Sequence, residues 1–119
     1  MSTIHHLLQQ RCRHLETALT DSELAAHCSL QPSWQIENGK LCKTFAFENY
    51  YQTLAFVNAI AFVIHADDHH PELTVTYNRC VVKFDTHSVN GGKGGLSEND
   101  FICSAKVDAI HAQGLVHAA

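Results

Sequence analysis

The amino-acid sequence predicts an α+β protein in which two hairpins form one four-stranded antiparallel sheet and three helices cover it, in the order α-ββ-α-ββ-α. Two observations support this class. Short turns, rather than helical crossovers, join the strand-like segments, and capping signals precede all three helical segments. With 119 residues, 45% of them hydrophobic, the chain can bury one core. We predict a single domain over residues 20–119, and residues 1–19 as an extension that is a peripheral helix or mobile.

The first half of the predicted domain contains a short helix and a hairpin. Thr20-Asp21-Ser22-Glu23 has the pattern of a capping box, which predicts a helix ending at about Ser29. Asn38-Gly39 supplies the two positive φ angles of a type I′ turn between strands over residues 34–37 and 40–45. Trp34 and Ile36 are expected to share one apolar face of the first strand.

The central helix is predicted from Asn49 as its cap to about Asp67. It is apolar almost all round, which is typical of a helix buried on several sides. Its two apolar stripes are Tyr50, Leu54, Val57, Ala61 and Ile64, and then Phe56, Ile60 and Val63. One sheet covers only one side of such a helix, so the spare apolar face predicts a homo-oligomer.

The second hairpin and the last helix complete the order. Pro71 stops the central helix, and the strands over 73–77 and 80–86 flank a turn. Ser97-Glu98-Asn99-Asp100 then caps a helix that runs to about Ala112.

Charge and cysteine usage exclude several classes of protein. The net charge of −4 gives no footprint for nucleic acid. The longest apolar run, Leu54 to Ile64, is shorter than the about 20 residues that a membrane span needs. Five cysteines without a C-x-x-C pair indicate reduced thiols rather than a disulfide framework or a zinc site. The N-terminus lacks the charged-then-apolar order of a signal peptide, so we expect a soluble, cytoplasmic protein.

The densest polar cluster is His65-Ala66-Asp67-Asp68-His69-His70-Pro71, at the end of the central helix. The negative helix end and the two aspartates favour a protonated imidazole, which makes a general acid plausible near neutral pH. Taken alone, the stretch is more typical of a solvated helix end. His65 and His69 also have the i, i+4 spacing of metal ligands, but without a glutamate between them this signal is weak.

Two further features lie downstream. Thr86-His87-Ser88 ends the last strand, and a histidine there is usually surface decoration. Asp100 either supports the start of the last helix or orients an imidazole across a cleft. The glycine-rich stretch 91–95 does not match a phosphate-binding loop, because Lys93 is not followed by Ser or Thr, and it indicates a hinge or simple loop.

Taken together, these motifs resemble the pterin-4a-carbinolamine dehydratase family. The resemblance covers residues 20–112 and rests on His69-His70-Pro71, Tyr77, Thr86-His87, Gly94-Gly95-Leu96-Ser97 and Asp100. It implies a four-stranded antiparallel sheet with helices on one face, and association as a homodimer or homotetramer. The chain departs from the family pattern in its longer glycine loop and in having His65 where an acidic residue is common.

The resemblance also implies an activity, that of a hydro-lyase. Removal of water from 4a-hydroxytetrahydropterin would give quinonoid dihydropterin, with no metal or organic cofactor, and would recycle the pterin of an aromatic amino acid hydroxylase, the expected pathway partner. His69 and His87 are implied as acids at the 4a-hydroxyl, and His70 as a positioning group or base. Asp100 would orient one imidazole. Polar contacts to the pyrimidine edge are implied for Asp68, Thr86 and Ser88.

Two other functions stay open. Family members are also known as dimerisation partners of a transcription regulator, a role that would use the helix surface rather than the histidines. Divergent members suggest a pterin-related step in molybdenum cofactor metabolism.

Overall fold

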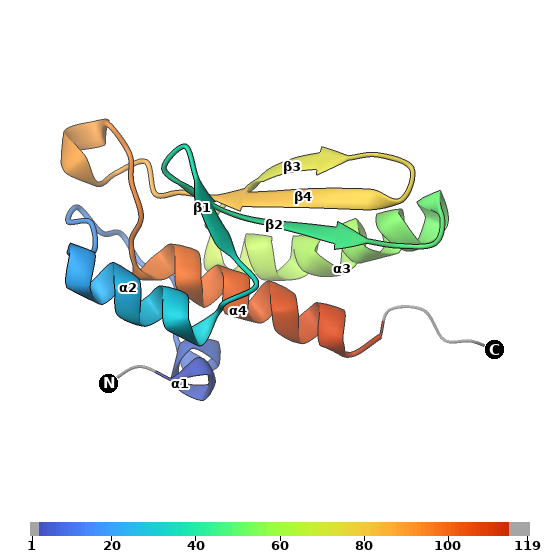
Figure 1. The fold of residues 1–119 in the computed structure, drawn as a ribbon, viewed down its shortest axis with the longest axis horizontal. Helices are drawn as coiled ribbons and strands as arrows, with labels where there is room; N and C mark the ends of the chain where they lie inside the picture. Colours follow the sequence, from blue (N-terminus) through green and yellow to red (C-terminus); the bar gives the residue numbers. More distant parts are fainter. Residues whose placement is uncertain (1–2, 115–119) are drawn as a thin grey trace.

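The computed structural model describes residues 3–114, so both outer ends of the predicted extension and domain, 1–2 and 115–119, lie outside the described residues. One antiparallel sheet with strand order β1-β2-β4-β3 lies against the helices on one of its faces (Figure 1). The predicted α+β class and element order are confirmed. The helices are α1 (Ile4–Gln9), α2 (Asp21–Leu30), α3 (Tyr50–Asp67) and α4 (Glu98–Ala112), and the strands are β1 (Gln35–Glu37), β2 (Lys40–Ala46), β3 (Glu72–Val75) and β4 (Arg79–Phe84).

Local signals set the boundaries of most elements. Asn38 and Gly39 adopt φ angles of 52° and 76°, as the type I′ turn between β1 and β2 requires. Thr20, Asn49 and Ser97 each accept a hydrogen bond from a backbone N–H in the first turn of α2, α3 and α4, which confirms the three predicted caps.

Strand β4 ends two residues before its predicted end. Thr86 instead forms an isolated bridge with Gly95, through Thr86 N–H to Gly95 O at 2.8 Å and Gly95 N–H to Thr86 O at 3.2 Å. The chain between them makes one short 3-10 turn, η1 (Asn90–Gly92). The bridge brings the end of β4 next to the start of α4.

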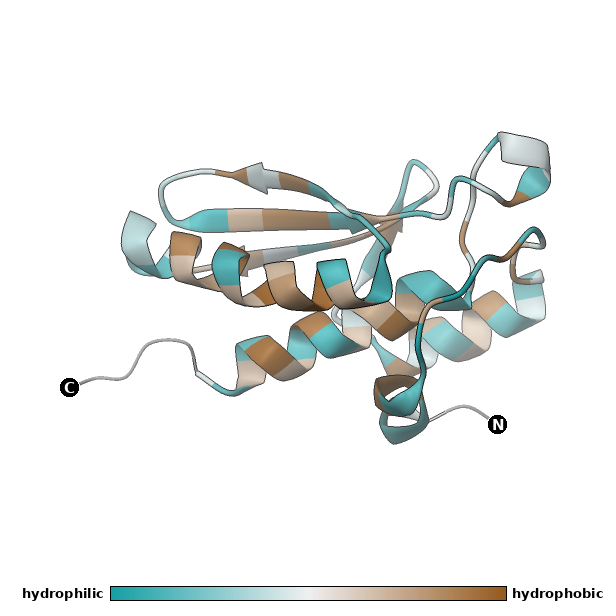
Figure 2. Cartoon of the chain, turned by 180° about the vertical axis from the view of Figure 1, so that it is seen from behind, coloured by the Kyte–Doolittle hydropathy of each residue, from teal (hydrophilic) through white to brown (hydrophobic). Residues whose placement is uncertain are grey.

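The core lies between the sheet and the inner faces of α3 and α4. Phe56 and Ile60 of α3, Phe84 of β4, and Phe101 and Ile102 of α4 are fully buried. Figure 2 shows hydrophobic residues recurring along these same elements. Burying a side chain of this size contributes roughly 1.5–3 kcal/mol, so this layer dominates the stability of the fold.

The predicted shared face of Trp34 and Ile36 is wrong. Trp34 is 4% exposed, whereas Ile36 is 42% exposed. Trp34 precedes β1, so strand alternation does not relate the two side chains. The indole instead packs against Phe45 and Phe84, with ring centroids 6.0 Å away in both cases.

The N-terminal extension, predicted over residues 1–19 as a peripheral helix or mobile, contains only a short helix in the residues that the structure describes. Helix α1 stops at Gln9, and residues 10–20 run without regular structure. Leu7 is fully buried, so α1 is not peripheral at that side chain. Two backbone contacts anchor the segment: Arg13 N–H donates to Asn99 Oδ1 at 3.2 Å, and Leu19 N–H donates to Leu96 O at 2.9 Å.

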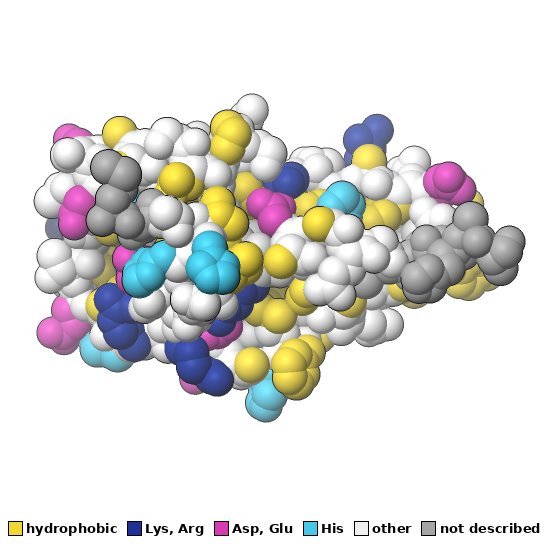
Figure 3. Space-filling view, turned by 90° about the horizontal axis from the view of Figure 1, so that it is seen from below, with side chains coloured by type: hydrophobic (Ala, Val, Ile, Leu, Met, Phe, Trp, Pro, Cys, Tyr) yellow, Lys and Arg dark blue, Asp and Glu magenta, His cyan; other side chains and the backbone are white. Residues whose placement is uncertain are grey.

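The surface of the described residues carries mixed charge. Figure 3 shows the helical face, where basic and acidic side chains are interspersed with hydrophobic ones. Within residues 3–114, no helix combines the length and the apolar character needed to cross a membrane.

Candidate functional site

A cleft of about 480 Å³ opens where the end of α3, the end of β4, the start of α4 and the N-terminal segment meet. Its wall contains all three histidines predicted from the motifs, His69, His70 and His87. The other lining residues are Cys12, Arg13, His14, Asp67, Asp68, Asp85, Thr86, Ser88 and Asn99. A cleft of this volume matches a small organic ligand.

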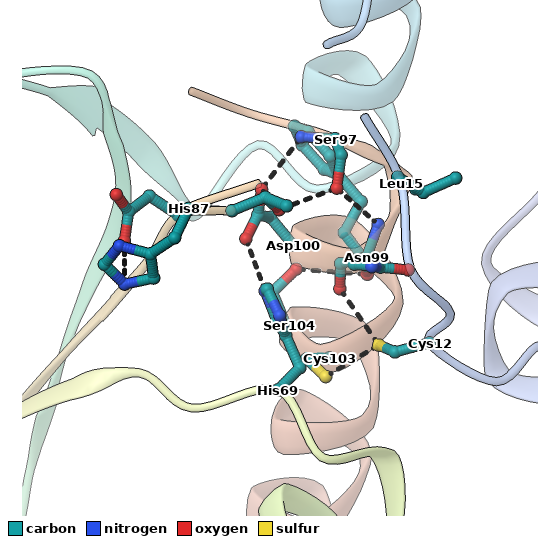
Figure 4. Close-up of polar contacts among 12 residues, drawn as sticks. Cys12, Leu15, His69, His87, Ser97, Asn99, Asp100, Cys103 and Ser104 are labelled. Atoms are coloured by element: carbon teal, nitrogen blue, oxygen red, sulfur yellow. Dashed lines mark hydrogen bonds and ion pairs between the residues drawn. The ribbon is translucent and has the colours of Figure 1, made fainter. Parts of the chain in front are cut away.

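His69 is the most firmly positioned of the three histidines. Its Nε2 lies 2.7 Å from Oδ1 of Asp100, as Figure 4 shows, and a carboxylate can only accept, so Nε2–H donates. The imidazole also stacks nearly parallel to the ring of Phe84, with centroids 5.8 Å apart and planes 6° apart. Its side chain is 11% exposed, so packing and the hydrogen bond together fix the ring.

Asp100 is fully buried and makes two further contacts. Its Oδ2 accepts hydrogen bonds from Ser97 N–H and from the Thr86 hydroxyl, both at 2.9 Å. The first contact completes the capping box of α4. Asp100 therefore both supports the helix start and holds an imidazole, the two roles that the sequence left open.

Thr86 is buried and its hydroxyl is committed within the protein. Besides Asp100, Thr86 Oγ1 lies 2.7 Å from Ser97 Oγ, and since the Thr86 proton goes to the carboxylate, Ser97 is the donor in that pair. The side chain thus supports Asp100, rather than presenting a free hydroxyl to the cleft as the pyrimidine-edge role would need.

His70 and His87 line the same cleft but are held loosely. Their side chains are 69% and 88% exposed. His70 Nε2 lies 3.6 Å from Asp68 Oδ1, and His87 Nε2 lies 3.9 Å from Asp85 Oδ1. These distances exceed those of a hydrogen bond, so both rings are free to reorient around a ligand.

Asp68 and Ser88, the remaining residues predicted to contact the ligand, differ in whether their polar groups are already hydrogen-bonded within the protein. The Asp68 side chain is largely exposed at the rim of the cleft. The Ser88 hydroxyl donates to the backbone carbonyl of Leu15, so it holds the N-terminal segment in place. Only the first of the two presents an uncommitted polar group to the cleft.

The end of α3 removes the helical relationship between His65 and His69 that a pair of metal ligands at i, i+4 would need. Asp68 adopts a left-handed conformation with φ 49°, so His69 lies beyond the helix and the two histidines are not one turn apart on it. Within the described part of the chain, no three or more His, Cys, Asp or Glu side chains are grouped as a metal site would need.

The sequence reasoning missed the wall that the N-terminal segment contributes. Arg13 and His14 line the cleft, as does Asn99, whose side-chain amide donates to Arg13 O at 2.6 Å. One signal was present: Arg11-Cys12-Arg13-His14 concentrates basic side chains in a chain with only 8 lysines and arginines. The contacts that place this segment join residues 55–87 positions apart, which no local pattern reveals.

The arrangement is suited to moving protons. With Nε2 of His69 bound to a buried carboxylate, Nδ1 has no hydrogen-bond partner among the described residues. A carboxylate in this position fixes the orientation of the ring and places its proton on Nε2. His69 can then exchange a proton with a ligand, while the exposed histidines approach the ligand from the cleft rim.

Comparison with known proteins agrees with this geometry. Residues 17–110 match the model of the family described as pterin 4 alpha carbinolamine dehydratase. A relative from Bdellovibrio bacteriovorus, named after the same family, is 56% identical over 104 residues, 87% of each chain. Another, from Xylella fastidiosa strain 9a5c, is 45% identical over 120 residues, 97% of this chain and 100% of the relative.

Two solved structures share the fold. A protein from Brucella melitensis titled transcriptional coactivator/pterin dehydratase aligns with a TM-score of 0.71 and 29% identity, over 79% of this chain and 98% of its own. A pterin dehydratase-like protein, titled a RuBisCO assembly factor in the alpha-carboxysome, aligns with a TM-score of 0.52 and 28% identity, over 65% and 84%. Sequence motifs, fold and comparisons converge, and the chain belongs to the pterin-4a-carbinolamine dehydratase family.

Proposed function

We propose that this chain removes water from 4a-hydroxytetrahydropterin to give quinonoid dihydropterin, and so recycles the pterin cofactor of aromatic amino acid hydroxylases. In this reaction the bond from C4a to oxygen breaks and the oxygen leaves as water. The leaving oxygen gains one proton, and the neighbouring ring nitrogen loses one as the new double bond forms. The two proton transfers balance, so an acid and a base suffice.

The observation that carries the proposal is the buried Asp100 holding His69 in a cleft that two more histidines line. In the proposed mechanism, His69 donates a proton to the 4a-oxygen, and Asp100 holds the imidazole in position for the transfer. A positioned proton transfer contributes about 10²- to 10⁴-fold in rate.

The exposed histidines have complementary proposed roles. His87 acts as a second acid at the 4a-hydroxyl, and His70 positions the flat ring and assists as the base. Asp68, at the rim, is the uncommitted acceptor for the amino group on the pyrimidine edge. Thr86 and Ser88 contribute indirectly, because their hydroxyls hold Asp100 and the N-terminal segment.

The test is a spectrophotometric dehydration assay on the purified protein. We expect acceleration over the spontaneous reaction, a large loss in His69→Ala, and a further loss in the double variant with His87→Ala. His65→Ala is the matched control, since this exposed histidine of α3 does not line the cleft. No acceleration by the wild-type protein would refute the activity, and a fully active double variant would refute the acid assignment.

A second proposal concerns association through α3. Tyr51 and Phe62, both on this helix, are 81% and 76% exposed, and such large apolar groups favour an interface. Both solved structures are described with roles that involve other macromolecules, one as a transcriptional coactivator and one as a RuBisCO assembly factor. We propose a homodimer or homotetramer that uses this surface. Light scattering at micromolar concentration should give a multiple of 13.2 kDa, reduced in Phe62→Glu. A mass of one chain would refute the proposal.

A further inference from the structure

Two cysteines meet at the wall of the cleft, one in the wall and one buried behind it. Sγ of Cys12, in the N-terminal segment, lies 3.2 Å from Sγ of Cys103 on α4, as Figure 4 shows. Both are free thiols, and they are 91 positions apart in sequence. The remaining cysteines in the chain, Cys28, Cys42 and Cys80, form no such contact among the described residues.

The surroundings hold the two sulfurs together. Cys12 N–H donates to Asp67 Oδ1 at 3.0 Å, and its thiol lies 3.5 Å from Asn99 O. Asp67 is in turn bound by Lys106 Nζ at 2.7 Å, from the same helix as Cys103. The Cys12 backbone is therefore fastened to α3, and α3 to α4, independently of the sulfur contact.

The two thiols differ in access. Cys12 is partly exposed and lines the cleft, so a small solute can reach it, whereas Cys103 is fully buried. The contact with Cys12, together with burial, raises the pKa of the Cys103 thiol. Cys12 is thus placed to react first and Cys103 to follow, which is the arrangement of a redox-sensitive pair.

We propose that Cys12 and Cys103 are a modification site: a hydroperoxide oxidises them to a reversible disulfide that fastens the N-terminal segment to α4. The Cys12 thiol loses its proton, its sulfur attacks one peroxide oxygen and the O–O bond breaks. A sulfenic acid forms, and the leaving hydroxide or alkoxide takes up the proton from Cys12 as water or an alcohol. The Cys103 sulfur then attacks the Cys12 sulfur and expels hydroxide, which takes up the Cys103 proton as water. The two thiols lose two electrons, and the peroxide gains them.

The disulfide acts on the wall of the cleft. Arg13 and His14, which follow Cys12 directly, line the cleft, so the bond restrains a part of the wall that lacks regular structure. Closing a loop of this length also restricts the unfolded chain and stabilises the fold. A thiol reductant reverses the step by thiol–disulfide exchange.

Peptide mapping tests the bond. The reduced protein is treated with hydrogen peroxide, blocked with an alkylating agent and cleaved after glutamate, which places Cys12 in peptide 1–16 and Cys103 in peptide 99–119, each as its only cysteine. We expect these two peptides joined in monomeric chains, with the loss of two hydrogens, and separated by reductant. Cys12→Ser and Cys103→Ala each abolish the product, while Cys28→Ser, an equally partly exposed cysteine, retains it.

Hydrogen exchange on the same samples tests whether the disulfide restrains the N-terminal segment against α4. Amides of residues 10–19 should exchange more slowly in the oxidised protein, and its thermal midpoint should rise by several degrees. The proposal is overturned if both thiols stay open to alkylation, if the disulfide joins two chains or another cysteine, or if exchange of this segment is unchanged. None of these readouts depends on pterin turnover, so they stand apart from the proposed activity.

Discussion

Replacing Asp100 by asparagine separates the two roles of this buried side chain, which are to cap α4 and to hold the imidazole of His69. The amide is isosteric, and its oxygen can still accept from Ser97 N–H and the Thr86 hydroxyl, so the cap of α4 survives. Its NH₂ group then faces Nε2 of His69, which sits 2.7 Å from the replaced oxygen. The imidazole must accept there instead of donating, so its tautomer changes and the charge-assisted hydrogen bond is lost.

The magnitudes follow from these contacts. Asp100→Asn exchanges one charge-assisted hydrogen bond for a neutral one, so the free energy of unfolding should fall by about 1 kcal/mol. Asp100→Ala removes the acceptor of Ser97 N–H, of the Thr86 hydroxyl and of His69 Nε2–H. Ser97 and Thr86 are buried, and two buried donors at roughly 1–3 kcal/mol each give about 2–6 kcal/mol. The rate should fall by about 10²-fold or more in both variants, because each loses the positioned acid.

The assay combines kcat/KM for carbinolamine dehydration with urea unfolding of the same samples. Asp100→Asn should be folded, only slightly destabilised and nearly inactive. An asparagine variant with kcat/KM within a factor of about three of wild type would refute the reasoning, since it would show that no ionised carboxylate is needed behind His69.

Three further predictions concern stability. Lys106→Met leaves the buried Asp67 carboxylate without its cation, which lies 2.7 Å away in the wild type, and should lower the free energy of unfolding by about 3 kcal/mol in urea titrations. Adding Asp67→Asn should restore much of this stability. An unchanged free energy of unfolding in the single variant would contradict the ion pair. Gly39→Val forces a β-branched residue to φ 76° and should cost about 1–2 kcal/mol in the same titration, whereas Gly39→Asn should cost less. Burial of its inner face and the charge of Lys43 lower the pKa of His111, so the unfolded chain takes up this proton at a higher pH than the folded one. The resulting loss of folded-state stability is absent well above pH 6.5 and grows as the pH falls below it. As the pH is lowered from 7.5 to 5.5, the thermal midpoint of His111→Gln should therefore rise relative to that of the wild type. A difference that stays constant over this range would oppose the assignment.

Short-range signals explain why most of the fold could be predicted. The caps at Thr20, Asn49 and Ser97, and the Asn38-Gly39 turn, each depend on residues within one turn of one another. Such contacts are encoded locally, so one sequence is enough to place them.

The site was predictable only in part, because many of its contacts join residues that are far apart in the sequence. Motifs pointed to the three histidines and Asp100, and these residues line or support one cleft. The end of α3 at about Asp67 was predicted and is confirmed, but the left-handed conformation of Asp68, which turns the chain before His69, was not visible in the spacing. Nor was the use of Thr86 as a support for Asp100, because that contact depends on how β4 and α4 pack.

The sharing of one carboxylate between helix start and imidazole also limits how the cleft can be redesigned. Apart from asparagine, whose oxygen can still accept from Ser97 N–H, a substitution at position 100 made to suit a new substrate also loosens the first turn of α4. Attempts to alter ligand preference should leave it alone and begin with the side chain of Asp68, which is largely exposed at the rim of the cleft and lies 3.6 Å from His70, beyond hydrogen-bond distance.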